Sequence, residues 1–297
     1  MKRLDPGHII IVGLGLIGGS LAAASRKAFP HARIIGVSRS RRALIKAKKE
    51  GWIHEGFQNL RQALRESKIN LPHLVVVCTP VDTLKDFLAR IDRFAPAGTF
   101  VTDAGSVKGF LVRWAGKRKW RHIQFVGAHP MAGSHKQGID FAQPDLFKQA
   151  LTFVTPARHS SLTAVREVTN FWKEISKRAV ILSPDEHDRL TAQVSHLPHL
   201  LAALLVTGTS AKALGFAASG FLDATRIAKA DPGLWVSIFL ENRKELYRLL
   251  ENFTKELGRI QKIFKSGDRR RLKQLLTQAQ RYRAILDKGS LGGHQRI

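Results

Sequence analysis

The stretch that decides the fold is His8-Ile9-Ile10-Ile11-Val12-Gly13-Leu14-Gly15-Leu16-Ile17-Gly18-Gly19-Ser20. Apolar, β-prone residues lead into the glycine pattern, and a helix-compatible segment, residues 20–28, follows. A dinucleotide-binding turn needs this order of buried strand, tight glycine turn and helix, although an ordinary glycine turn is the alternative. Gly13 permits the sharp turn, Gly15 lets the backbone approach a pyrophosphate, and Gly18 lets the helix pack against the strand. The predicted cofactor contacts of this turn are Gly13, Gly15, Leu16, Ile17 and Gly18.

The end of the second predicted strand, residues 32–38, bears on which dinucleotide is bound. An acidic residue there would hydrogen-bond the ribose hydroxyls of NAD. The chain has no carboxylate at this point, and its hydroxyl and guanidinium groups suit a 2′-phosphate, which arginine binds through two hydrogen bonds. We therefore expect NADP in preference to NAD, unless these arginines simply face water in so basic a chain. The expected contacts are Ser38, Arg39, Ser40 and Arg41.

The remaining pattern divides the chain into two parts. Strand-like runs and helical segments alternate first, and the further strands are expected at residues 74–78, 98–103, 124–128, 151–155 and 179–182. From Pro184 only helical segments follow, at residues 185–195, 199–212, 234–263 and 269–287. This predicts an α/β fold, with a doubly wound sheet over residues 1–183 and an all-α domain over residues 184–297. Thr79 and Pro80 end a central strand, where ligands bind in such sheets, and join the predicted cofactor contacts.

The amino-acid composition limits which kinds of binding partner are expected. The 297 residues include 49 lysines and arginines against 23 aspartates and glutamates, a net charge of +26. A nucleic-acid-binding protein is one interpretation. The basic residues are spread along the whole chain without a basic tail or an aromatic-interleaved block, so we favour a solvated basic surface that also attracts anionic ligands. No nucleic acid is therefore expected as a partner.

The location is expected to be cytoplasmic. The single cysteine, Cys78, can form no internal disulfide, which fits a reducing compartment. No run of about 18 apolar residues is present, so no membrane span is expected. The first predicted strand follows Met1 so closely that no signal peptide is expected either.

Two loops at predicted strand ends carry reactive groups. Ser106 follows the strand at residues 98–103, and His129 follows the strand at residues 124–128. In a doubly wound sheet both face the cofactor side, where a neutral imidazole can accept the proton of a substrate hydroxyl during oxidation. A hydrogen-bonded structural histidine is the alternative.

The helical part contains a second set of candidates. His196 and His199 are three residues apart and can share a helix face, but no cysteine or carboxylate stands at metal-ligand spacing, so no metal is expected. Arg226 lies in a small, apolar stretch, and a partly buried arginine needs an anionic partner. That partner is either Asp223, which is the structural alternative, or a substrate carboxylate.

Taken together, these motifs resemble the prephenate and arogenate dehydrogenases, the TyrA family of tyrosine biosynthesis, over roughly residues 8–250. Members of this family oxidise and decarboxylate prephenate, or its amino analogue arogenate, between a Rossmann domain and a helical domain that forms a homodimer. The matching motifs, in family order, are residues 13–20, Cys78-Thr-Pro-Val81, Asp103-Ala-Gly-Ser-Val-Lys108, His129-Pro-Met-Ala-Gly-Ser134, His187-Asp188, Ser195-His-Leu-Pro-His199, Thr225-Arg-Ile-Ala228, and Asp231-Pro with Trp235.

The resemblance also implies residue roles. His129 matches the catalytic histidine, which takes the proton of the ring hydroxyl, and Ser106 matches the serine that orients it. Arg226 matches an arginine that grips a substrate carboxylate. His199, beside His196 in one motif, matches a histidine near the substrate side chain. Ser134 matches a hydroxyl residue of the same pocket.

Three alternatives stay open. The substrate can be prephenate, which His199 and the net positive charge favour, or arogenate, toward which NADP preference points because some NADP-preferring relatives use it. A β-hydroxyacid dehydrogenase shares the architecture but uses a lysine in the second domain as base, whereas the candidate base here is His129. A basic nucleic-acid-binding protein with a Rossmann shell would bind DNA or RNA with steep salt dependence and show no turnover.

Overall fold

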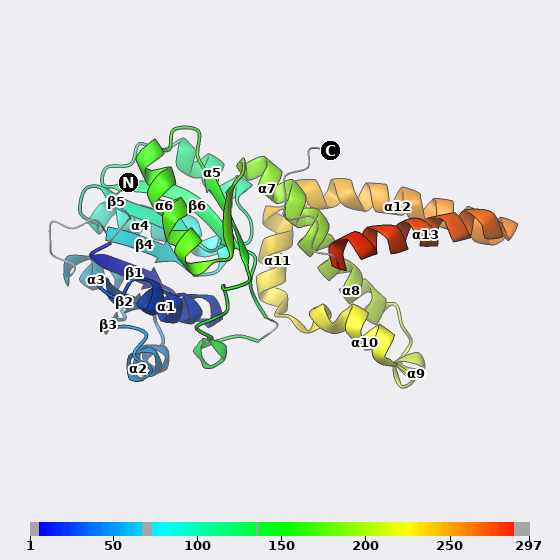
Figure 1. Cartoon of the computed structure of the whole chain (residues 1–297), viewed down its shortest axis with the longest axis horizontal. Coiled ribbons are helices and arrows are strands. Elements are labelled where there is room, and N and C mark those ends of the chain that lie inside the picture. The colour runs from blue at the N-terminus through cyan, green and yellow to red at the C-terminus, as the bar shows by residue number, and fades with distance from the viewer. Residues whose placement is uncertain (1–5, 67–72, 135, 288–297) are drawn as a thin grey trace. The chain divides into compact units, whose positions relative to one another are not determined.

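The computed structural model describes residues 6–66, 73–134 and 136–287, and by backbone contacts the chain divides into two compact units, Met1–Leu246 and Tyr247–Ile297. The first unit is built on an eight-stranded sheet with the order β3-β2-β1-β4-β5-β6-β7-β8 (Figure 1). The strands are β1 (His8–Val12), β2 (Arg33–Val37), β3 (Glu55–Phe57), β4 (His73–Val77), β5 (Thr99–Asp103), β6 (Ile123–Pro130), β7 (Leu151–Pro156) and β8 (Arg178–Ile181).

The strand directions fix where a ligand can bind. Strands β1 to β6 pair in parallel, β7 runs antiparallel to β6, and β8 is parallel to β7. The chain crosses the sheet between β3 and β4, so the order reverses between β1 and β4, and ligands bind at the carboxyl ends of strands at such a point. The predicted doubly wound sheet is confirmed.

Helices cover both faces of the sheet because its central strands are buried on both sides. Ile9 and Ile11 lie in the apolar cluster on one face of the sheet, whereas Ile10 and Val12 lie in the cluster on the other face. This alternation follows from the two-residue repeat of a strand. The helices are α1 (Leu16–Ala28), α2 (Arg41–Lys49), α3 (Leu60–Glu66), α4 (Leu84–Phe94), α5 (Gly109–Gly116) and α6 (Leu162–Ile175), with short turns η1 (Val81–Thr83) and η2 (Ile139–Phe141).

After β8 the described chain is helical, as predicted, but two boundaries differ from the prediction. The expected helix at residues 234–263 is broken at Asn242, which has non-helical backbone angles. The expected break near Pro198 is absent, because a π turn precedes it and the helical run continues to Thr207. The elements are α7 (Pro184–Thr191), η3 (Ala192–His196), α8 (Leu197–Thr207), α9 (Ala211–Leu214), α10 (Ser219–Thr225), η4 (Arg226–Lys229), α11 (Pro232–Glu241), α12 (Arg243–Ser266) and α13 (Arg269–Asp287).

The first compact unit extends beyond the last strand. Helix α7 packs against α5 and β7, and α11 packs against η1. The second of these contacts is a small apolar cluster of Val81, Val107 and Ile238. The compact unit therefore does not end where the strands end, and the domain boundary at residues 183 and 184 stays a prediction.

One described helical run, Pro184–Thr207, is long and apolar enough to cross a membrane by length and composition alone, which the sequence analysis did not expect. Its 24 residues reach a mean hydropathy of 1.3, and 28% of the most apolar window is buried. The run nevertheless carries the buried polar residues His187, Asp188 and His196, which contact other elements of the first unit. Buried hydrogen-bonded groups of this kind are typical of a helix packed within a protein.

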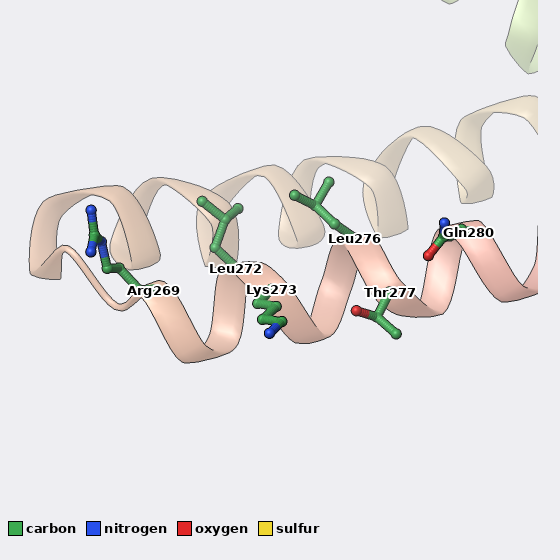
Figure 2. Close-up of a pocket in the computed structure, with 6 residues that line it drawn as sticks. All are labelled: Arg269, Leu272, Lys273, Leu276, Thr277 and Gln280. Atoms are coloured by element: carbon green, nitrogen blue, oxygen red, sulfur yellow. The ribbon is translucent and has the colours of Figure 1, made fainter.

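The second unit contains most of α12 and all of α13, joined at Gly267, whose positive φ of 65° permits the turn. Figure 2 shows Leu272 and Leu276 of α13 pointing toward α12. A groove of about 570 Å³ runs along α13 and has no histidine or carboxylate in its lining. The groove therefore offers no carboxylate or imidazole for acid–base chemistry.

Candidate active site

Three buried side chains form a chain of hydrogen bonds at the end of β6. His129 is contributed by β6, and His187 and Asp188 come from α7. His129 Nδ1 lies 2.9 Å from His187 Nε2, and His187 Nδ1 lies 2.8 Å from Asp188 Oδ1. The exposed fractions are 7%, 0% and 5%. The sequence named His129 as the candidate base, and the tertiary structure supplies its partner from 58 residues away.

Two backbone hydrogen bonds hold the Asp188 carboxylate at the start of α5. The backbone N–H groups of Lys108 and Gly109 donate to its two carboxylate oxygens, each over 2.8 Å. The Asn242 side-chain amide donates to the Asp188 carbonyl over 2.9 Å and to His196 Nδ1 over 3.1 Å. Asn242 is thus a site residue that sequence reasoning missed. The sequence showed only a polar residue inside an expected helix, and its burial became visible in the structure.

His196 has one unsatisfied ring nitrogen. Because its Nδ1 accepts from Asn242, a neutral His196 carries its proton on Nε2. That Nε2 is buried and has no hydrogen-bond partner among the described residues. A buried donor without an acceptor costs about 1–3 kcal/mol, which a ligand acceptor would offset.

A buried ion pair lies beside His129. Lys108 Nζ contacts the Asp103 carboxylate and donates to the Ala128 carbonyl over 2.9 Å, while the Ala128 N–H donates to Asp103 over 3.1 Å. Both charged side chains are fully buried. They hold together the carboxyl ends of β5 and β6 and place a cation next to the imidazole.

The surroundings keep His129 neutral. Burial lowers the pKa of His129 well below its ordinary value of 6.5, and neighbouring His187, Lys108 and His196 lower it further. Burial likewise lowers the pKa of His187 well below 6.5 and that of His196 to about 4. A neutral imidazole can accept a proton, so the electrostatics fit a general base.

His199 is held by an aromatic stack. Its ring lies parallel to that of Trp235, with 3.4 Å between centroids and 14° between planes, and Phe239 packs against both rings. His199 is 8% exposed, and burial lowers its pKa. The stack fixes α8 against α11, which carries Trp235 and Phe239.

Three predicted residues lie apart from this hydrogen-bonded chain. Ser106 is half-buried in the loop after β5 and makes no hydrogen bond to His129 or to another described residue. Ser134 is exposed and accepts from the Lys136 N–H over 3.2 Å. Arg226 begins η4 and is exposed, so the expectation of a partly buried arginine is wrong. Among the described residues it forms no ion pair, including none with the exposed Asp223.

The glycine turn between β1 and α1 has the shape of a phosphate cradle. Gly13 has a positive φ of 96°, and a Cβ there would lie 2.9 Å from the Cys78 carbonyl oxygen. A Cβ at Gly18 would lie 1.8 Å from the Gly13 carbonyl oxygen. At Gly15 a Cβ would meet open space, and no side chain caps the first turn of α1. The residues present therefore fit a dinucleotide pyrophosphate.

The segment after β2, residues 38–42, carries exposed cations, and we call it the rim beyond β2. Arg39 and Arg41 are exposed and form no ion pair among the described residues, whereas Arg42 pairs with Asp140. The Ser38 hydroxyl accepts from the Ser40 N–H over 3.2 Å. The Ser40 hydroxyl accepts from Ala43 N–H over 3.2 Å and so caps α2.

The end of β4 is shaped by a short hydrogen-bonded turn. Thr79 accepts from the Thr83 hydroxyl over 2.8 Å, and Pro80 is exposed. This turn follows β4 next to the Gly13 turn, where the strand order reverses. Within residues 6–66, 73–134 and 136–287, no three His, Cys, Asp or Glu side chains are placed to hold a metal ion.

Comparison with known proteins places this arrangement in context. Residues 21–182 match the prephenate dehydrogenase nucleotide-binding domain, and residues 183–278 match the prephenate dehydrogenase dimerization domain. A prephenate dehydrogenase of Bacillus subtilis is 34% identical over 93% of this chain and 75% of its own. A cyclohexadienyl dehydrogenase of Zymomonas mobilis is 30% identical over 94% of this chain and 96% of its own.

A solved structure superposes on nearly the whole chain. The prephenate dehydrogenase from A. aeolicus in complex with hydroxyphenyl propionate and NAD+ superposes with a TM-score of 0.87. It is 29% identical, and the match covers 96% of this chain and 100% of that one.

Proposed function

The chain belongs to the prephenate dehydrogenase family, and we propose that it converts prephenate to 4-hydroxyphenylpyruvate by NAD(P)-dependent oxidative decarboxylation. The observation that carries the proposal is the neutral, buried His129 at the carboxyl end of β6, in the sheet whose β1 leads into the glycine cradle. An imidazole there is a base on the side of the sheet where the dinucleotide would bind.

In the proposed reaction, His129 accepts the proton of the ring hydroxyl of prephenate. Loss of that proton raises the electron-donating power of the oxygen, so the hydride leaves the same carbon more easily. A nicotinamide cofactor bound at the glycine turn would supply the hydride acceptor. The bond to the ring carboxylate then breaks, carbon dioxide departs, and the electron pair of that bond completes the aromatic ring. Burial keeps His129 neutral beforehand by lowering its pKa, and neighbouring His187 and the Lys108 charge disfavour the imidazolium further.

We propose that the two carboxylates of prephenate are held by residues of the helical part. Arg226 is an exposed cation without an ion-pair partner among the described residues, and arginine binds a carboxylate through two parallel hydrogen bonds. His196 offers a buried donor without a partner among the described residues, and His199 offers a further polar group. Ser134 lies outside the helical part, in the loop after β6, and offers a hydroxyl from that side. A net charge of +26 also steers a dianion toward the protein.

For the cofactor, we propose NADP in preference to NAD. Residues 38–42, which follow β2, include no acidic residue to accept hydrogen bonds from ribose hydroxyls. Arg39 and Arg41 are free to bind a 2′-phosphate, whereas Ser38 and Ser40 bind local backbone N–H groups. The arginines therefore supply the main attraction for the phosphate.

Arogenate is the second candidate substrate. It carries an ammonium group, which a carboxylate would recognise, and the 30% identical relative is a cyclohexadienyl dehydrogenase. Asp223 is exposed and unpaired among the described residues, whereas Asp231 caps α11 through Leu234 N–H over 2.7 Å. Asp223 is therefore the acid available to an ammonium group.

We also propose a cytoplasmic homodimer formed through the helical part. Residues 183–278 match a dimerization domain, and α8 presents Leu204 and Leu205, which are 54% and 50% exposed. Apolar side chains exposed to this extent are typical of an interface. Light scattering during gel filtration would give about twice the mass of one 33.1 kDa chain; a mass of one chain would contradict the dimer.

An initial-rate assay tests the reaction. Prephenate and arogenate are each combined with NAD+ and with NADP+, and the absorbance of the reduced cofactor is followed. We expect turnover, fastest with prephenate and NADP+. Turnover with arogenate alone would make it the substrate, and a faster rate with NAD+ would reverse the cofactor preference. No turnover with any pair would overturn the dehydrogenase proposal, and DNA and RNA binding would be measured next.

A further inference from the structure

We propose that His187 and Asp188 are positioning residues that fix the tautomer of His129, so that Nδ1 carries the proton and Nε2 presents the lone pair to the substrate. The proposal rests on the proposed function only in assigning His129 as the base. The arrangement itself is a property of three side chains and two backbone N–H groups in the first compact unit.

The Asp188 carboxylate sets the direction of the hydrogen bonds. An ionised carboxylate only accepts hydrogen bonds. Asp188 Oδ2 accepts from Gly109 N–H, and Oδ1 accepts from Lys108 N–H and lies 2.8 Å from His187 Nδ1. Because the two backbone donors are fixed at the start of α5, the carboxylate cannot turn away from the ring. His187 Nδ1 must therefore carry a proton and donate it.

The state of His187 then determines that of His129. A neutral imidazole has one N–H, so a His187 that donates from Nδ1 has a bare lone pair at Nε2. This Nε2 lies 2.9 Å from His129 Nδ1, which must supply the proton of that hydrogen bond. His129 Nε2 is left as the basic nitrogen, and no described residue makes a hydrogen bond to it.

The groups around His187 favour its neutral form. Burial, the Lys108 ammonium and His196 lower its pKa well below 6.5, and Phe153 of β7 packs edge-on against the ring, with 5.4 Å between centroids. Lys108 in turn is held by Asp103. Asp188 is the only acid in contact with His187 among the described residues, and it opposes these effects through one hydrogen bond.

The arrangement has a consequence after proton transfer. When His129 Nε2 has taken the hydroxyl proton, the ring carries a positive charge and still donates from Nδ1 to His187. The Asp188 carboxylate, one ring further away, stabilises that charge through the same hydrogen-bonded chain, as the acidic residue does in a serine-protease triad. His187 and Asp188 therefore assist the base without touching the substrate.

Histidine ring NMR tests the tautomer directly. The full-length protein is labelled with ¹⁵N-histidine, and long-range ¹H–¹⁵N spectra at neutral pH report which ring nitrogen is protonated. The signals of His129 are assigned by their loss in His129→Asn. We expect the proton on Nδ1, and a proton on Nε2 would overturn the proposal. Because this readout needs no turnover, it stands apart from any failure of the proposed reaction.

A pair of variants tests the contribution to rate. In His187→Gln the amide reaches the position of Nε2 and can accept from His129, whereas in His187→Asn it reaches only the position of Nδ1. We expect kcat to fall by about 10²-fold in the Asn variant and only a few-fold in the Gln variant, with KM and cofactor affinity unchanged. His122→Asn, at the start of β6 far from the site, is the matched control.

Two outcomes of the variant pair would contradict the proposal. Equal losses in the Gln and Asn variants would show that His187 acts only through packing, and no loss in either would show that His129 does not need it. The pH profile of kcat/KM adds a further check, because a changed tautomer in the Asn variant should move its acidic limb. If the Asn variant does not fold, the NMR result on the unaltered protein still decides.

Discussion

The histidine cluster and the rim beyond β2 face the same edge of one sheet but are built in opposite ways. In the cluster, His129, His187 and Asp188 are buried, and hydrogen bonds join the two rings over 2.9 Å and the His187 ring to the Asp188 carboxylate over 2.8 Å. At the rim, Arg39 and Arg41 are exposed and have no ion-pair partner among the described residues. The histidine cluster is therefore buried and held by hydrogen bonds, whereas the rim is charged and exposed to solvent.

The difference follows from what each region is proposed to do. A base must hold one nitrogen in one protonation state, which burial and a second ring can impose. A phosphate is attracted by cations that can rotate to meet it, and burying those cations would cost several kcal/mol each. Rate should therefore depend on the buried cluster, and cofactor choice on the exposed rim.

The largest effect is expected from His129→Asn. It removes the base while the glycine cradle stays intact, so kcat should fall by about 10²-fold or more with cofactor affinity unchanged. Stopped-flow or steady-state rates and fluorescence titration of the cofactor measure the two quantities. A rate near that of the unaltered protein would remove His129 from the chemistry.

The next effect is expected from Arg226→Ala, which tests an exposed residue outside the cluster. Loss of a charge-assisted hydrogen bond is worth about 1.5–3 kcal/mol, so KM for prephenate should rise by roughly 10- to 10²-fold with a smaller change in kcat. Arg226→Lys should recover part of the affinity, because it keeps the charge but loses the two parallel bonds. An unchanged KM would place the substrate carboxylate elsewhere.

Acid should lower the free energy of unfolding, because His196, buried beside the histidine cluster, is held neutral in the folded chain. His196 has its pKa lowered to about 4 in the folded chain, so between that pH and 6.5 the unfolded chain binds the extra proton. Stability is therefore full above pH 6.5 and is lost as the pH falls through this window, by roughly 2 kcal/mol between pH 7 and pH 5 from His196 alone.

Urea unfolding at several pH values measures this loss, with His196→Gln as the variant that should flatten the curve. An equally steep curve in the variant would assign the pH dependence to other groups. His129, His187 and His199 contribute in the same direction, because burial lowers the pKa of each.

The smallest effect is expected at the rim. Arg39→Asp should lower the preference for NADP+ over NAD+ by about 10-fold, because it replaces one phosphate contact by a repulsive charge. The ratio of kcat/KM for the two cofactors measures it. Arg93→Ala, which removes an exposed arginine in the last turn of α4, controls for net charge. Equal ratios in all three proteins would mean that the phosphate is bound elsewhere.

Local patterns predicted most of the fold. The apolar run before Gly13 and the alternation of strands and helices have short periods, so they could be read without the tertiary structure. β3 was not assigned to any residues, because Glu55–Phe57 is too short to show a period. The helix break at Asn242 was missed because its cause lies in contacts with Asp188 and His196, distant in the chain.

The sequence by itself determined that the chain has a dinucleotide-binding turn, a β2 end without an acid, and a histidine at a strand end, since each depends on neighbouring residues alone. The tertiary structure alone decided that His129 contacts His187 and Asp188, that Ser106 makes no bond to it, and that Arg226 is exposed. Hydrogen bonds depend on atom positions within a few tenths of an ångström, and packing of α7 on α5 and β7 sets those positions.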